Sequence, residues 1–115
     1  GELRCTSTCQ IEVDVHYSQL QAHAPEGDWL TMAPFSILSL DIECAGRPGV
    51  FPEPEHDPVI QIANHVTVQG ESKPRLRCIL TLDECAPIAD VEVLSFASER
   101  DLLSAWQQMM VKVDP

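Results

Sequence analysis

Two acidic residues stand two positions apart at the end of an apolar run, and carboxylates at this spacing could bind metal ions. The run is "ILSLDIECAG", residues 37–46, in which Ile42 separates Asp41 from Glu43. In a β-strand, residues i and i+2 point to the same face with α-carbons about 6.5 Å apart, so both side chains can reach one site. Two carboxylates that converge there repel each other unless a cation lies between them. The spacing therefore predicts a shared cation site for the two acids.

The chemistry of such a site would depend on the ions that it binds. Hard oxygen ligands suit Mg²⁺ or Mn²⁺. Two such ions about 4 Å apart can activate a water molecule and stabilise the leaving oxygen during phosphodiester hydrolysis. The alternative is that Asp41 and Glu43 are solvated acids at the end of a strand, without any function. The spacing alone leaves both interpretations open.

Other polar residues give weaker indications of a site. Glu53, Glu55 and Asp57 also show the i+2 spacing, but they lie in a proline-rich loop and are typical of a solvated acidic turn. We interpret His56 and His65 as surface or strand residues. The sequence pairs no histidine with the possible nucleophiles Ser36, Ser39 and Cys44. Asp41 and Glu43 remain the strongest candidates.

Composition limits the class of protein. The chain has 115 residues, of which 44% are hydrophobic, so we expect one globular domain with a modest core. A net charge of -11 argues against a surface that grips phosphate throughout, but it permits an active site that meets nucleic acid through metal ions. Five scattered cysteines are typical of a reduced compartment, cytosol or nucleus. No apolar run reaches the roughly 18 residues of a membrane span, so no membrane partner is expected.

Hydrophobic periodicity predicts several strands followed by a helix. Alternating patterns predict strands over four ranges and a short edge strand over a fifth; these are residues 10–17, 35–42, 59–68, 75–82 and 91–96. Their close spacing implies an antiparallel meander. The segment 45–58 has four prolines and two glycines, which predict a loop. Apolar residues at helical spacing from Leu102 to Val113, preceded by the capping pair Ser98 and Asp101, predict a helix.

The extended motif resembles the first exonuclease motif of the family B DNA polymerases. The resemblance rests on "ILSLDIECAGRPGVFPEPEHDPVIQIA", residues 37–63. Its D-I-E core is shared with many nucleases, whereas "ECAGR" and "GVFPEPEHDPVIQI" are specific and resemble only some branches of the family. The similarity continues through "PEGDW" upstream and "DLLSAW" and "VDP" downstream, so it covers nearly the whole chain. Pro48 departs from the pattern, which has lysine there, but this loop position does not touch the acids.

The resemblance implies a mixed α/β fold: a partial RNase H-like 3′–5′ exonuclease fold with antiparallel strands followed by a helix, ending before the rest of the sheet. Residues 1–33 would be the end of an amino-terminal domain and its linker, and residues 34–115 the amino-terminal part of the exonuclease domain. Asp41 would bridge two Mg²⁺ or Mn²⁺ ions. Glu43 would bind the ion that positions the attacking water.

The implied function is that of a replicative DNA-directed DNA polymerase, in the nucleus, which proofreads the single-stranded primer 3′ end. Accessory subunits and a sliding clamp would bind through regions outside this sequence. The remaining metal-binding aspartates and a catalytic tyrosine would lie beyond Pro115, so the isolated chain is expected to be inactive. A second hypothesis, from another class, is a non-catalytic acidic interaction module that docks a partner through the proline-rich loop 47–58.

Overall fold

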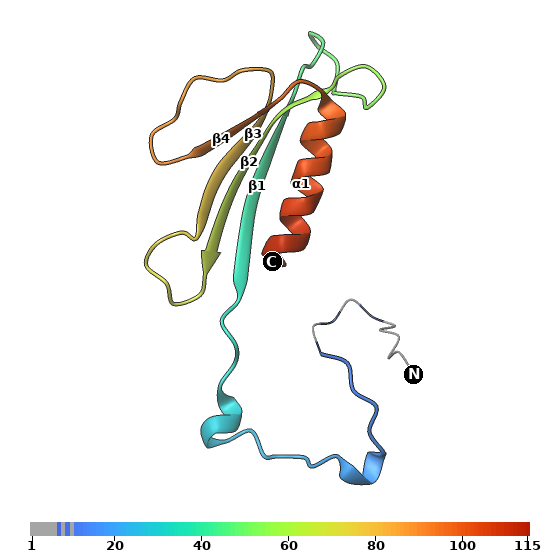
Figure 1. Cartoon of the computed structure of the whole chain (residues 1–115), viewed down its shortest axis with the longest axis vertical. Coiled ribbons are helices and arrows are strands. Elements are labelled where there is room, and N and C mark those ends of the chain that lie inside the picture. The colour runs from blue at the N-terminus through green and yellow to red at the C-terminus, as the bar shows by residue number, and fades with distance from the viewer. Residues whose placement is uncertain (1–6, 8, 10) are drawn as a thin grey trace. The chain divides into compact units, whose positions relative to one another are not determined.

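The computed structural model describes residues 7, 9 and 11–115 of the chain (Figure 1). Contacts between α-carbons divide the chain into two units, Gly1–Met32 and Ala33–Pro115. The assignment of residues 1–33 to a preceding domain stays a prediction. None of the described helices is long and apolar enough to cross a membrane.

The prediction of a strand over residues 10–17 is wrong for residues 11–17. Residue 10 lies outside the described residues. Residues 11–16 form no regular element, and Tyr17–Gln19 form a short 3₁₀ helix, η1. Ile11 is 81% exposed. Alternation of apolar and polar residues cannot make a strand by itself, because a strand needs a neighbour for its backbone hydrogen bonds. A second 3₁₀ helix, η2, spans Gly27–Leu30.

Unit Ala33–Pro115 contains a four-stranded sheet. Its strands are β1 (Ser36–Cys44), β2 (Val59–Val68), β3 (Leu76–Leu82) and β4 (Glu92–Phe96), in that spatial order (Figure 1). The pairs β1–β2 and β2–β3 are antiparallel, as predicted, whereas β3–β4 is parallel. The sheet is therefore mixed, and β4 is an edge strand, as the sequence indicated.

The parallel direction of β4 results from the loop 83–91. This loop carries the chain back along the sheet, and two of its residues, Asp83 and Asp90, have φ values of 62° and 59°. Aspartate tolerates this left-handed conformation better than most residues do, because its short polar side chain can bond locally. The Asp83 N–H donates to the carbonyl of Phe96 over 2.8 Å, which closes the loop.

Helix α1, Glu99–Val113, covers one face of the sheet. Its N-cap is Ser98, whose hydroxyl accepts a hydrogen bond from the Asp101 N–H at 3.2 Å, as the sequence predicted. The carboxylate of Glu99 accepts a hydrogen bond from the Val59 N–H at 2.7 Å. The first turn of the helix is thereby attached to the start of β2.

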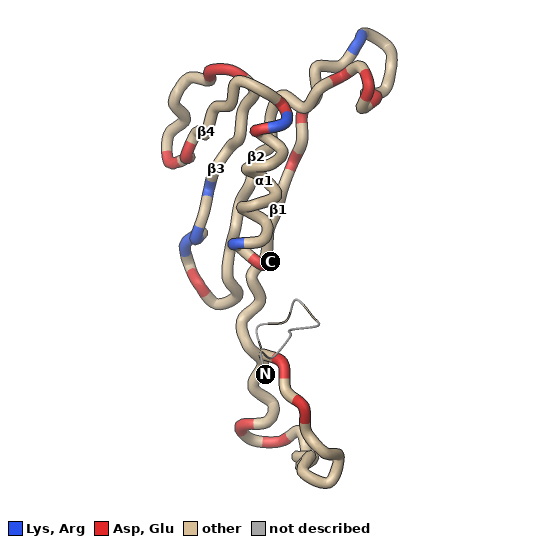
Figure 2. Tube along the Cα trace, turned by 45° about the vertical axis from the view of Figure 1, so that its right-hand side comes forward, with Lys and Arg blue, Asp and Glu red and all other residues tan. Residues whose placement is uncertain are grey.

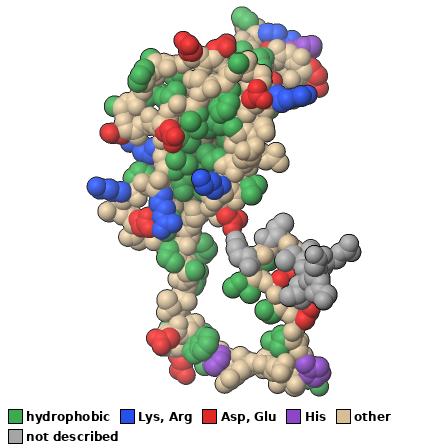
Figure 3. All heavy atoms as spheres, viewed as in Figure 1, with side chains coloured by type: hydrophobic (Ala, Val, Ile, Leu, Met, Phe, Trp, Pro, Cys, Tyr) green, Lys and Arg blue, Asp and Glu red, His purple; other side chains and the backbone are tan. Residues whose placement is uncertain are grey.

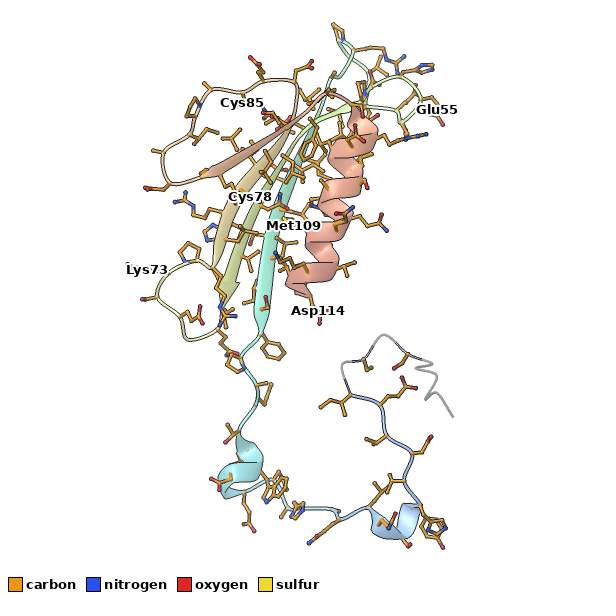
Figure 4. All side chains as sticks on the ribbon, viewed as in Figure 1. Glu55, Lys73, Cys78, Cys85, Met109 and Asp114 are labelled. Carbon is orange, nitrogen blue, oxygen red and sulfur yellow. The ribbon has the colours of Figure 1, made fainter. Side chains whose placement is uncertain are left out.

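The core lies between α1 and the sheet, where hydrophobic side chains gather (Figure 3). It is built on Ile62, Cys78, Leu80 and Leu102. Cys78 of β3 and Met109 of α1 approach each other with sulfur atoms 3.6 Å apart (Figure 4). Burial raises the pKa of the Cys78 thiol, so this thiol stays protonated and behaves as a small apolar group.

Leu102 gives a direct test of the packing of α1. Its side chain has no exposed surface, whereas that of its neighbour Leu103 is 39% exposed. We expect Leu102→Ala to reduce the free energy of unfolding by about 2–5 kcal/mol, because it leaves a cavity in the core. Leu103→Ala, the matched control, should cost less than about 1.5 kcal/mol. Urea unfolding measures both; equal effects would contradict this arrangement of the helix.

Candidate functional site

The register of β1 against β2 decides where the two acids lie. Ile42 is opposite Ile62, which is 1% exposed in the core beneath α1. Side chains alternate along a strand, so Asp41 and Glu43 lie on the face that is turned away from α1. We call this the open face; the residues of it that matter below are Ser39, Asp41, Glu43, Ala63, His65, Arg77 and Ile79.

Both carboxylates are exposed and available for a cation. The Ile42 N–H donates to Oδ1 of Asp41 over 3.1 Å, which restrains that side chain. Within the described part of the chain, neither Asp41 nor Glu43 forms an ion pair with Lys, Arg or His. Acids without a cationic partner on a rigid strand have the donor chemistry that a hard divalent ion requires.

The strand changes its geometry directly after the second acid. A β-bulge lies between Glu43 and Cys44, so Cys44 pairs with Val59 and the register shifts there. The Ala45 N–H then donates to the carbonyl of Pro58 over 2.9 Å, which closes the base of the loop 45–58. Bulges bend a strand and redirect its side chains. The regular alternation that sets the direction of Asp41 and Glu43 ends at this point.

The loop 45–58 is held by an ion pair. Arg47 donates from Nε to Oδ1 of Asp57 over 3.1 Å and from its terminal nitrogen to Glu53 over 2.7 Å. The Glu53 N–H also donates to Asp57 over 2.8 Å. Asp57 is only 4% exposed, so its interpretation as part of a solvated turn is wrong: the guanidinium covers it. Glu55 lies on the outside of the loop (Figure 4).

The Arg47–Asp57 pair also sets the charge state of the aspartate. The hydrogen bonds from Arg47, followed by that from the Glu53 N–H, hold the pKa of Asp57 below its usual 3.8. The same contacts raise the pKa of Arg47. An ordered loop thus borders the acid-bearing end of β1. Its tip presents Phe51, which is 89% exposed.

A hollow of about 390 Å³ lies beside Asp41. Its polar lining on the open face comes from Asp41, Ser39, His65 and Arg77, and its apolar lining includes Ile79, Ile88 and Val91. Sequence reasoning missed His65 and Arg77 as members of the site. The signal was available only through strand register, which places His65 opposite both Ser39 and Arg77.

Several candidates are not brought together. Among the described residues, no three His, Cys, Asp or Glu side chains form a group that could hold a metal ion. In the described part of the chain, Asp41 and Glu43 therefore have no third such side chain grouped with them. Ser39 is opposite His65 in the strand pair, but no hydrogen bond joins these two described side chains. Cys44 is half-buried, and the structure gives it no role.

The comparisons with known proteins define the class. The family model of the DNA polymerase family B exonuclease domain matches residues 3–115. The chain belongs to this family, which confirms the resemblance drawn from the D-I-E motif. The family and the four-stranded mixed sheet followed by a helix confirm the predicted α/β fold class, and the family is consistent with an RNase H-like fold.

More specifically, the chain is similar to DNA polymerase delta catalytic subunits. It is 59% identical to that of Glycine max over 109 residues, 55% identical to that of Candida albicans over 109 residues and 54% identical to that of Drosophila melanogaster over 109 residues. Each match covers 95% of this chain and 10% of the relative. The chain thus spans about a tenth of the length of these relatives.

The lowered pKa of Asp57 predicts how stability depends on pH. A depressed carboxylate pKa contributes stability that is complete above the unfolded value of 3.8 and is lost as the pH falls through the folded value. Asp57→Asn should therefore lower the thermal unfolding midpoint at about pH 5, and its difference from the wild type should shrink towards about pH 2. Glu55→Gln, in the same loop, is the control and should follow the wild type. A constant difference for Asp57→Asn would contradict this.

Proposed function

We propose that this chain is the first part of the proofreading 3′–5′ exonuclease domain of a delta-type DNA polymerase catalytic subunit. The supporting observation is that Asp41 and Glu43 stand together on an exposed strand face, inside a sequence that belongs to the family B exonuclease domains. In this proposal, residues 1–33 are the end of a preceding domain and residues 34–115 begin the exonuclease. The whole protein would extend primers and would excise mispaired nucleotides from the single-stranded primer 3′ end.

Asp41 and Glu43 would hold two Mg²⁺ or Mn²⁺ ions. Both side chains would act as ligands of these ions through their carboxylate oxygens. When bound, the ions would supply an activated water and would stabilise the leaving oxygen of the phosphodiester. The chain itself would keep the two carboxylates in position, because β1 is held by its pairing with β2.

The cellular setting follows from the same proposal. The protein would act in the nucleus on DNA, and accessory subunits and a sliding clamp would bind through regions outside these residues. The free thiols of Cys9, Cys44, Cys78 and Cys85 are compatible with a reducing compartment.

A second candidate function is a docking module, and one observation favours it. The loop 45–58 is ordered by Arg47 and Asp57 but presents Val50 and Phe51 to solvent, with exposed fractions of 49% and 89%. Exposed apolar side chains on an ordered loop are a feature of protein contact sites. If the chain is only a docking module, substitution of Asp41 and Glu43 should leave both excision and partner binding unchanged.

Substitution of both acids tests the proposal in the full-length protein. Asp41→Ala with Glu43→Ala should reduce excision of a mispaired primer terminus by about a thousandfold or more, because several kcal/mol of transition-state stabilisation come from the bound ions. Nucleotide addition should change little. The control, Glu55→Ala with Glu84→Ala, removes the same charge at two exposed positions elsewhere and should keep both activities. Excision that survives loss of Asp41 and Glu43 would refute the assignment.

The isolated 115-residue chain should not degrade single-stranded DNA in the presence of Mg²⁺. Two carboxylates without a third ligand are an incomplete two-ion site, as the described residues show. The measurement is incubation of an end-labelled oligonucleotide with the chain, with the full-length protein as the positive control. Degradation that is abolished by Asp41→Ala would show that these residues suffice for cleavage and would overturn the expectation.

A further inference from the structure

Basic residues are concentrated in one short segment of an acidic chain. The chain has seven Lys and Arg residues against 18 Asp and Glu, and three of the seven, Lys73, Arg75 and Arg77, lie within "KPRLR". This segment contains the end of the β2–β3 turn and the start of β3 (Figure 2). A local excess of positive charge attracts anions, which can be acidic side chains of the same chain or an external ligand.

Two of these three side chains lack an internal partner. Arg75 donates to both carboxylate oxygens of Glu71, one of them at 3.0 Å. Arg77 and Lys73 form no ion pair with any residue in the described part of the chain. Both are exposed, so their charges are available to an external anion.

Arg77 also connects two hollows in the surface. It lines the hollow of about 390 Å³ that contains Asp41 and His65, and it lines a second hollow of about 490 Å³ together with Lys73. One carboxylate, that of Asp90, borders the second hollow. Because Arg77 lines both hollows, they are neighbours on the surface, and the path considered below runs from Asp41 past Arg77 to Lys73.

The register fixes the scale of this path. His65 is opposite Arg77, two residues along β2 from the partner of Asp41. With a rise of about 3.4 Å per residue and strands about 4.8 Å apart, the α-carbons of Asp41 and Arg77 are about 12 Å apart. A long arginine side chain can cover a large part of this distance and reach an anionic group next to the one at Asp41.

We propose that single-stranded DNA crosses the open face along this path, with its backbone phosphates contacted by Arg77 and Lys73. The inference rests on the proposed function and adds two DNA-binding residues to it. The charge is complementary, and the path is continuous with the candidate cation site. Ile79, Ile88 and Val91 add apolar surface to the first hollow, against which the apolar part of a nucleotide can lie.

Excision kinetics of the full-length protein test this proposal with a single-stranded oligonucleotide as substrate. Arg77→Gln with Lys73→Gln should raise KM about tenfold and leave kcat within about twofold, because the lost contacts bind the strand away from the bond that is cut. The slope of log(kcat/KM) against the logarithm of the salt concentration should become less steep by about 0.7 for each phosphate contact removed. The matched control, Arg100→Gln with Lys112→Gln on α1, removes equal charge and should leave KM and the salt dependence unchanged.

Charge-conserving variants separate binding from folding. Arg77→Lys with Lys73→Arg should keep most of the wild-type KM; a KM as high as that of the Gln variants would overturn the proposal. An unchanged KM for the Gln variants, an equal rise for the α1 control, or a fall in kcat alone would overturn it too. If the Asp41→Ala, Glu43→Ala double variant still excises nucleotides, the proposed function itself is refuted. If that variant is inactive but the Arg77→Gln, Lys73→Gln variant has an unchanged KM, only this inference is refuted.

Discussion

The pairing register of β1 and β2 is the constraint on which the rest of the structure depends. Ile42 opposite Ile62 places one set of β1 side chains on the side of the core and leaves Asp41 and Glu43 in solvent. A slip of one residue would exchange the two faces of β1, so that the carboxylates would lie on the side of the core and Ile42 on the open face. The backbone pairing that joins β1 to the sheet is therefore the same interaction that sets the direction of the acids.

The two faces of the sheet have separate roles because of this register. Leu102, Trp106 and Met109 of α1 pack on one face, and Trp106 donates to the Asn64 side chain over 3.0 Å, which satisfies a buried amide. The other face has mainly polar and small side chains beside the apolar residues of the hollow, and it carries no comparable core within the described residues. Substitutions on the open face can therefore change chemistry or binding with little effect on folding, which is the arrangement expected of a site built on a rigid element.

The sequence defined the elements well wherever periodicity and packing agree. The range 59–68 is that of β2, and the cap at Ser98 was predictable, since both are local patterns. The pattern at 10–17 failed because alternation does not create a partner strand. The parallel direction of β4 depends on the path of the loop before it, and the burial of Asp57 depends on a contact with Arg47, ten positions away. A local sequence pattern contains neither of these. The place of Arg77 beside Asp41 required the register of three strands.

The bulge between Glu43 and Cys44 has a consequence for how this region tolerates changes in length. The bulge ends the regular alternation of side chains along β1. Residues added to or removed from the loop 45–58 therefore need not change the direction of Asp41 and Glu43. Relatives with a longer or shorter connection can therefore keep the same carboxylate orientation. The length of the connection and the direction of the two acids are structurally independent.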